Sequence, residues 1–278
     1  MAADLGWRIA ALRRPVSELR RSMAFYTRGL GFVADAPAEA GRALMRLGEE
    51  CIELVEQRTP QAAQWPPGPD VRFQHAAIVA ADMAAAFERL ARLSPRAISR
   101  HGPQRLPAAA GGVQAFKFFD PDGHPLELLA FPPGTGKARW QAGSGAGPTL
   151  GIDHFALSVS DVARSIAFYE HTLGLTLAAR QTNRGPEQAW LDGLDGDGVV
   201  VDVVAMASAV PGTPHVELLG YRQPAPRTHE SLNPPAAVDC LLFEREAGPA
   251  TPADRAGAVF ARDPDGHAFA CAPTGVRP

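Results

Sequence analysis

Polar and apolar positions follow one pattern that recurs along the chain. Each copy opens with a short alternating or apolar run, continues through an Asp, Glu or Ser at a helix N-cap position, and then places apolar residues at helical spacing. Glycines end the helical stretch, Gly29 or Gly31 in the first copy and Gly174 in a later one. Strand-like runs separated by turn residues follow. The pattern therefore predicts a repeated βαβββ unit.

Aligning the chain with itself supports this interpretation. Residues 16–26 match residues 159–169, both ending in Phe-Tyr and both leading into a Leu-Gly pair, and residues 74–90 fit the same frame. A fourth copy near the C-terminus is degenerate, and its helix is hard to see. The predicted modules are residues 8–56, 73–131, 151–221 and 236–273.

The modules predict an α+β fold in which strands outnumber helices. Stretches rich in Pro and Gly separate them, and the one richest in Gly, residues 133–149, is interpreted as the linker between a first domain, 1–132, and a second domain, 150–278. Within the third module, residues 188–194 (QAWLDGL) are expected to form one of the strands.

A five-residue turn, Asp-Pro-Asp-Gly-His, occurs twice. It spans residues 120–124 in the second module and 263–267 in the fourth, where Pro and Gly are suited to a hairpin. Three residues after the His, the second module has Glu127 and the fourth has Ala270. His124 and His267 recur whether or not the Glu does, so we expect them to be structural or to face solvent.

Composition narrows the function classes. A net charge of −3 with no dense cluster of Lys and Arg argues against nucleic-acid binding. Three scattered cysteines, Cys51, Cys240 and Cys271, fit a reducing compartment better than a disulfide framework. The sequence shows no signal peptide and no apolar run near the roughly 18 residues of a membrane span. We therefore expect a cytoplasmic protein that acts on a small molecule, not on a membrane.

Metal-ligand residue types recur at equivalent places in the modules. The first-strand position reads Ala11, His75, His154 and Cys240, and the last-strand position reads Glu53, Glu127, Glu217 and Ala270. Because alternate residues of a strand point to the same side, the first and last strands of a module can project these side chains into one concave face. Two imidazoles and two carboxylates suit one divalent ion, Ni, Zn, Fe, Mn or Co. The predicted metal ligands are His75, Glu127, His154 and Glu217.

These residues, the Phe-Tyr-x-x-x-Leu-Gly helix ends and the repeated hairpin resemble the vicinal-oxygen-chelate superfamily, which includes glyoxalase I, methylmalonyl-CoA epimerase, extradiol dioxygenases and bleomycin resistance proteins. The resemblance covers nearly the whole chain and implies modules paired into two cup-shaped mixed β-sheets. Pairing the second module with the third, and the first with the fourth, would put all four ligands in one cup. Pairing the first with the second would leave each cup incomplete. We expect the former, in a monomer or a homodimer.

The ligand order His, Glu, His, Glu looks like that of a glyoxalase I or an epimerase. The resemblance then implies a lyase or isomerase that moves a proton in a substrate with vicinal oxygens through a metal-chelated enediolate, with Glu217 or Glu127 as the base. One alternative is an Fe(II) extradiol-type dioxygenase acting on a catechol-like substrate. Another is a protein that binds a drug or metabolite without catalysis.

Two further features of the sequence affect the choice among these reactions and substrates. His215 lies two positions before Glu217, so it is a candidate acid-base group on the same strand face or a histidine facing solvent at the strand mouth. The Arg that glyoxalases commonly carry shortly after the first-strand His has no match after His75 or His154. Because the neighbouring positions are apolar or small, we expect an uncharged substrate, such as an aromatic one.

Overall fold

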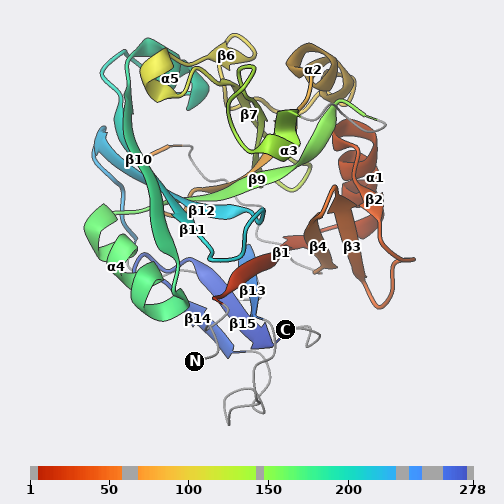
Figure 1. Cartoon of the computed structure of the whole chain (residues 1–278). Helices are drawn as coiled ribbons and strands as arrows, with labels where there is room; N and C mark the ends of the chain where they lie inside the picture. The colour runs from red at the N-terminus through yellow and green to blue at the C-terminus, as the bar shows by residue number, and fades with distance from the viewer. Residues whose placement is uncertain (1–5, 58–67, 142–146, 230–237, 246–258, 274–278) are drawn as a thin grey trace.

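The computed structural model describes residues 6–57, 68–141, 147–229, 238–245 and 259–273 of the 278-residue chain. Its strands form two mixed β-sheets, one of eight strands and one of seven, with helices on their outer sides (Figure 1). This α+β architecture confirms the predicted fold class. No helix in the described part of the chain is both long and apolar enough to span a membrane.

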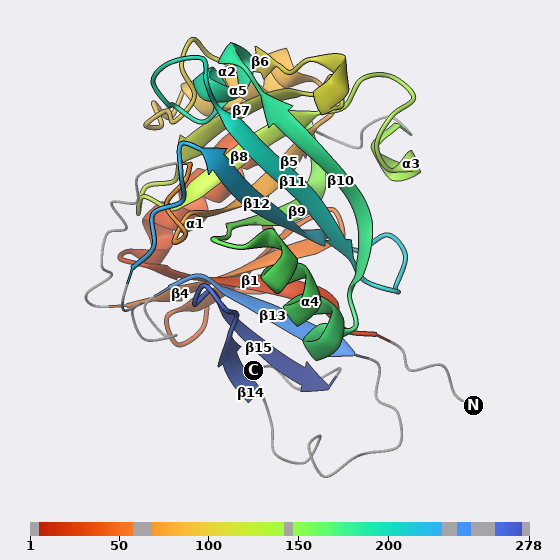
Figure 2. The same cartoon turned by 90° about the vertical axis from the view of Figure 1, so that its left-hand side faces the viewer.

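The second and third modules build the eight-stranded sheet, whose order is β10-β11-β12-β9-β5-β8-β7-β6. The third module supplies β9 (Thr149–Ser158), β10 (Thr176–Arg184), β11 (Val200–Ala207) and β12 (His215–Gln223). The second supplies β5 (Gln74–Ala80), β6 (Gln104–Arg105), β7 (Gln114–Phe119) and β8 (Pro125–Ala130). These strands lie side by side in a strongly curved sheet (Figure 2). We call its concave face the cup.

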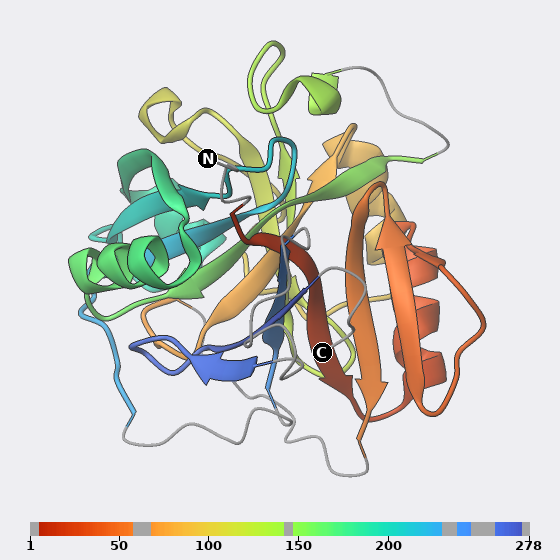
Figure 3. The ribbon, with the colours of Figure 1, turned by 60° about the horizontal axis from the view of Figure 1, so that its bottom comes forward.

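The first and fourth modules build the seven-stranded sheet, whose order is β14-β15-β13-β1-β4-β3-β2. The first supplies β1 (Arg8–Val16), β2 (Val33–Ala34), β3 (Arg42–Leu47) and β4 (Glu50–Glu56). The fourth supplies β13 (Cys240–Arg245), β14 (Val259–Arg262) and β15 (Ala268–Pro273). Figure 3 shows β1 between the strands of the first module and those of the fourth.

The expected module pairing is confirmed by the strand neighbours. β5 pairs antiparallel with β9, which joins the second module to the third, and β1 pairs antiparallel with β13, which joins the first to the fourth. Each sheet therefore draws one module from each half of the chain. The division into domains at 1–132 and 150–278 stays a prediction, and residues 138–141 of the expected linker form a short helix, α3 (Ala138–Gln141).

The module helices follow the apolar spacing. α1 (Leu19–Leu30), α2 (Met83–Ala91) and α4 (Val162–Leu173) bury one face each on the sheets. The carboxylates of Asp82 and Asp161 cap α2 and α4, and Gly31 and Gly174 end α1 and α4 in the left-handed conformation that glycine favours. In the fourth module, whose helix is hard to see in the sequence, residues 246–258 lie outside the described residues.

One predicted strand is wrong. Residues 188–194 contain most of a short helix, α5 (Pro186–Leu191), and not a strand. Gly185 has a φ of 96° and Pro186 occupies the first turn, so the chain leaves β10 sharply and starts a helix, to which the fixed φ of proline is suited. A 3₁₀ turn, η1 (Ala108–Ala110), is a further short element.

The repeated turn fastens neighbouring modules to each other. In the first copy, Asp120 accepts from the Tyr26 hydroxyl at 2.9 Å, Asp122 accepts from Ser17 N at 3.0 Å, and His124 Nε2 lies 2.7 Å from the Pro15 carbonyl. The second copy makes the same contacts through Asp263 to Tyr169, Asp265 to Ser160 and His267 to Ser158. Both histidines are buried. Their expected structural role is confirmed, and exposure to solvent is excluded.

Replacing Asp122 by Ala should therefore loosen the first module from the second. Asp122 also accepts from Ser22 Oγ at 2.8 Å and pairs with Arg21 at 2.7 Å. Losing an ionised acceptor that serves buried donors costs about 1–3 kcal/mol, and each kcal/mol corresponds to roughly 2–4 °C in the midpoint of thermal unfolding. The control is Glu88→Ala, which removes only an exposed pair with Arg92. Equal midpoints for the two variants, measured by circular dichroism, would contradict this role of the turn.

Candidate functional site

The two strands at the centre of the cup place the two predicted histidine ligands next to each other. β5 and β9 are antiparallel neighbours in which His75 lies opposite Ala156 and His154 lies opposite Ala77. The two imidazoles are therefore diagonal neighbours, with ring centroids 5.7 Å apart in an edge-to-face arrangement. Both side chains are buried.

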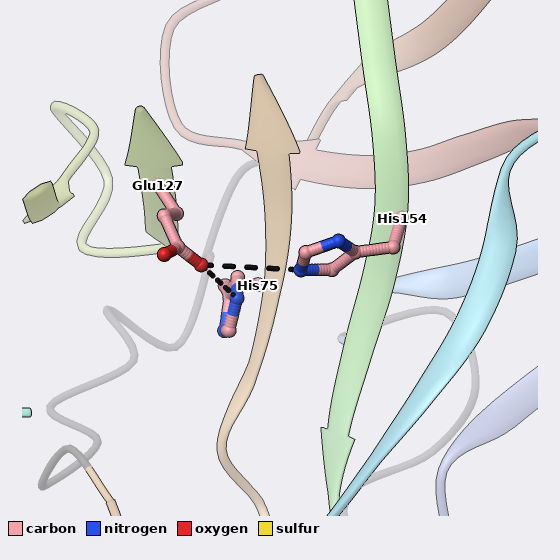
Figure 4. Close-up of side chains that lie close together, drawn as sticks. All are labelled: His75, Glu127 and His154. Atoms are coloured by element: carbon pink, nitrogen blue, oxygen red, sulfur yellow. Dashed lines mark ion pairs between the residues drawn. The ribbon is translucent and has the colours of Figure 1, made fainter. Parts of the chain in front are cut away.

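The two predicted carboxylates come from the strands on either side. Glu127 on β8 lies opposite Ala77, and Glu217 on β12 lies opposite Ala156, so both face the cup beside the histidines. Glu127 Oε2 is 2.7 Å from His75 Nε2 and 3.9 Å from His154 Nε2 (Figure 4). Glu217 Oε2 is 3.5 Å from His154 Nε2. The fold brings all four predicted residues together.

Three of the four form a tight set. His75, Glu127 and His154 each offer a ligand atom, and these atoms lie within 4.8 Å of one another. Their side chains point toward a common centre from three adjacent strands (Figure 4). Glu217 lies at the edge of this set, and its side chain is the more exposed of the two carboxylates, 17% against 7% for Glu127.

Buried imidazole nitrogens in this set lack hydrogen-bond partners. Within the described part of the chain, neither ring nitrogen of His75 has such a partner, although Nε2 lies 2.7 Å from Glu127 Oε2, and His154 Nε2 has none either. An unpaired buried polar atom costs free energy comparable to a lost hydrogen bond, so native proteins rarely keep three in one place. Nitrogens left free in this way are suited to a metal ion.

Burial and charge separate the pKa values of the four groups. Burial lowers the pKa of His75 to about 4, so its imidazole is neutral. Burial also opposes charge on His154, but the carboxylates of Glu217 and Asp153 outweigh it and raise the pKa to about 9. Burial would raise the pKa of Glu127, yet the Lys117 ammonium and the imidazoles lower it to about 2. Burial raises the pKa of Glu217.

Asp153 orients His154, and the sequence analysis missed it. Its Oδ2 is 3.2 Å from His154 Nδ1, which leaves Nε2 turned toward Glu127 and Glu217. Trp140 of α3 donates to Asp153 Oδ1 at 3.0 Å, and Lys137 Nζ lies 3.2 Å from the same oxygen. The residues around 137–141, expected to be a plain linker, thus hold the carboxylate behind a candidate ligand. In the sequence, Asp153 could have been noticed as the acidic residue directly before His154.

His215 lies beside this pair. On β12 it is the direct neighbour of His154, with ring centroids 5.2 Å apart, and its Nδ1 is 3.9 Å from Asp153 Oδ2. Burial, helped by the charge of His154, lowers the pKa of His215 to about 3. The side chain is 16% exposed, so the alternative of a histidine facing solvent does not describe it. With Asp153 and His154 it forms a second group of potential ligands.

A second polar cluster on the inner face was also missed. Lys117 of β7 lies directly opposite Glu127, and its Nζ is 2.7 Å from Asp192 Oδ1. Asp192, which follows α5, also accepts from the Tyr221 hydroxyl at 2.8 Å and from Gln188 at 2.7 Å. All four side chains are buried. An isolated Lys within an apolar strand carries no motif, which is why the sequence did not single it out.

The seven-stranded sheet has a different inner face. At the equivalent positions, Ala11, Cys240 and Ala270 are buried in an apolar cluster. Glu53 is held by Arg13 at 2.6 Å and by Arg42 at 3.2 Å. Burial raises the pKa of the Cys240 thiol to about 12, which disfavours the thiolate that a metal requires. A cavity of about 530 Å³ lies over this face.

The family model for the Glyoxalase/Bleomycin resistance protein/Dioxygenase superfamily matches residues 8–128 and 151–271. Glyoxalase I from Zea mays is similar in fold, with a TM-score of 0.61 and 18% identity over 95% of this chain and 92% of that chain. A putative dioxygenase from Bacillus subtilis has a TM-score of 0.57 and 15% identity over 98% of this chain and 87% of that chain. No curated protein matches the sequence.

At these identities the solved structures share the fold with this chain and establish nothing about its reaction. The family model, in contrast, matches both halves of the chain. Its first region contains His75 and Glu127, and its second contains His154 and Glu217. The chain therefore belongs to the Glyoxalase/Bleomycin resistance protein/Dioxygenase superfamily.

Proposed function

We propose that the protein is a metal-dependent enzyme that transfers a proton within a small molecule bearing two neighbouring oxygens, as glyoxalases and epimerases do. The observation that carries the proposal is the convergence of His75, Glu127, His154 and Glu217 in one cup. The two histidines occupy the first-strand position that recurs in the modules, and the two glutamates occupy the recurring last-strand position. Three imidazole nitrogens among them lack a hydrogen-bond partner within the described residues, which supports a metal ion as their common partner.

The donor set fits one divalent ion. Two imidazole nitrogens and two carboxylates are ligands that Zn, Ni, Fe, Mn and Co accept, and four protein ligands leave further positions open for ions that take six. Such an ion would polarise two adjacent substrate oxygens and lower the barrier to removing a proton from the carbon beside them. The residues do not discriminate among these metals.

Glu217 is the better candidate for the base. Its buried carboxylate has a raised pKa, which brings it closer to the working pH of a general base, and it is the more exposed of the two glutamates. Glu127, by contrast, is held ionised by Lys117 and the imidazoles. In this assignment Glu127 serves as a ligand, Glu217 accepts the proton from the substrate carbon, and His215 lies near enough to His154 to affect the same site.

A second candidate is a ring-cleaving dioxygenase that uses Fe(II). The tight set contains two histidines and one carboxylate, which is the ligand combination of many non-haem iron oxygenases, and Glu217 stands apart from it. His215 and Tyr221 on β12 are nearby groups able to exchange protons. A protein that binds a metabolite without catalysis needs neither a metal nor Glu217.

Metal content tests the proposal most directly. The purified protein loaded with Zn should hold about one ion per chain, and His154→Ala should lose most of it, because removal of a ligand typically lowers affinity by a large factor. His171→Ala is the control, since His171 is an exposed residue of α4. Elemental analysis measures the stoichiometry. Metal content that is negligible in the unaltered protein, or unchanged in His154→Ala, would overturn the site.

Metal affinity should rise with pH. A histidine ligand must be neutral, and the metal-free protein keeps His154 protonated up to a pKa of about 9. Binding therefore displaces a proton below that pH, and the Zn association constant should increase roughly tenfold per pH unit between pH 6 and 8 if one proton is displaced. His75, with a pKa of about 4, releases none in this range. Calorimetry in two buffers of different ionisation enthalpy measures the protons released, and a value near zero at pH 7 would contradict the charged state of His154.

Glu217→Gln separates proton transfer from metal binding. The variant keeps the size of the side chain and three ligands, so at saturating metal it should hold the ion while proton transfer falls by about 10²–10⁴-fold. The measurement is exchange of carbon-bound hydrogen for deuterium in a panel of 2-hydroxy and 2-oxo carbonyl compounds, followed by NMR. Glu88→Gln, an exposed substitution on α2, is the control.

The same proteins distinguish the two candidate reactions. Exchange by the unaltered protein that disappears in Glu217→Gln supports proton transfer. Absence of exchange, together with oxygen uptake on catechols by protein loaded anaerobically with Fe(II), favours the dioxygenase.

We further propose that the active form is a monomer or a homodimer, because a complete set of ligands lies within one chain.

A further inference from the structure

We propose that Lys117 binds a negatively charged oxygen of the substrate, so that the substrate of this cup is an anion. The proposal rests on the proposed function, because it concerns the molecule that the metal site would hold. Lys117 lies on the cup side of β7, directly opposite Glu127. Residues directly opposite each other on neighbouring strands have Cβ atoms about 5 Å apart, so the Lys117 side chain starts beside Glu127, and its charge acts on the Glu127 carboxylate.

The ammonium has donors to spare. It is 95% buried, and within the described part of the chain its one hydrogen bond goes to Asp192. A Lys has three N–H donors, so two remain without a protein acceptor in a place where water is largely excluded. A buried cation with unused donors is costly unless something else binds it.

Asp192 binds the Lys117 ammonium and is itself held by other buried side chains. Besides the bond from Lys117 to Oδ1, its carboxylate accepts at Oδ2 from Tyr221 of β12 and from Gln188 of α5, so both oxygens are paired. Gln188 in turn accepts from Asn183 of β10 at 3.0 Å. This chain of contacts links β7 of the second module to α5, β10 and β12 of the third. It positions Lys117 rigidly, since each member is buried and paired.

Apart from Asp192 and the carboxylates of Glu127 and Glu217, whose charges act on the ammonium, the surroundings of Lys117 are apolar. The ring of Phe73 lies with its centroid 5.8 Å from Nζ and packs against His75 with centroids 5.4 Å apart. Phe73, Leu219 and Tyr221 belong to one apolar cluster at this end of the cup. A compact molecule with an ionised oxygen for Lys117, two oxygens for the metal and an apolar body fits these groups. This revises the uncharged substrate expected from the residues near His75 and His154 alone.

Two probes test the proposal on Zn-loaded protein. 4-Nitrocatechol offers a phenolate and oxalate offers a carboxylate, and both carry adjacent oxygens. The test variant is the double substitution Lys117→Met and Asp192→Asn, which removes both charges of the pair, while the bound Zn would remain the partner of the Glu127 carboxylate. We expect Kd for at least one probe to rise about tenfold or more, as the loss of a charge-assisted hydrogen bond in a buried site predicts. In this double variant, bound 4-nitrocatechol should also lose the red-shifted absorbance of its fully ionised form.

The control is Arg100→Met with Asp195→Asn, which removes an exposed ion pair that also joins the second module to the third. Its Kd values should match those of the unaltered protein. The probe whose Kd depends on Lys117 identifies the class of anion. Unchanged Kd and absorbance in the test variant, with Zn content intact, would overturn the role of Lys117 while leaving the proposed function standing. Absence of Zn from the unaltered protein would instead overturn the proposed function, and the inference with it.

Discussion

The antiparallel pairing of β5 with β9 is the constraint on which the rest of the site depends. This pairing joins the second module to the third, and its register sets Ala77 opposite His154 and His75 opposite Ala156. A shift of one residue would turn one histidine to the outer face, because successive side chains of a strand point to opposite sides. Glu127 and Glu217 then follow, since each lies on the parallel neighbour of one of these strands.

The two sheets and the two repeated turns link different pairs of modules. Each sheet joins a module from the first half to one from the second, whereas each Asp-Pro-Asp-Gly-His turn joins neighbouring modules within one half. A buried ion pair, Arg14 with Asp239 at 2.5 Å, adds a further link between the first and fourth modules. Module positions are therefore set by several independent contacts, which suits a site whose ligands come from two halves of the chain.

Charge distribution distinguishes the two concave faces. In the cup, the carboxylates stand beside imidazole nitrogens that have no hydrogen-bond partner in the described part of the chain, and Lys117, opposite Glu127, pairs with Asp192. On the seven-stranded sheet, the equivalent Glu53 is neutralised by two arginines, and Ala11, Cys240 and Ala270 fill the other positions. Buried charges are stable only when they are paired, so the cup keeps a set of potential metal ligands, whereas the Glu53 carboxylate on the other face is already paired with arginines.

The sequence by itself determined the modules, the helices with their caps, and the four candidate ligands, because these depend on local periodicity and on residue types at repeated positions. It also favoured the pairing of the second module with the third, because only that pairing unites His75 with His154. Tertiary structure decided the rest. α5 replaced an expected strand, and Asp153, Lys117 and Asp192 became parts of the site through contacts between residues far apart in sequence. Such contacts depend on strand register and side-chain packing, which no local pattern specifies.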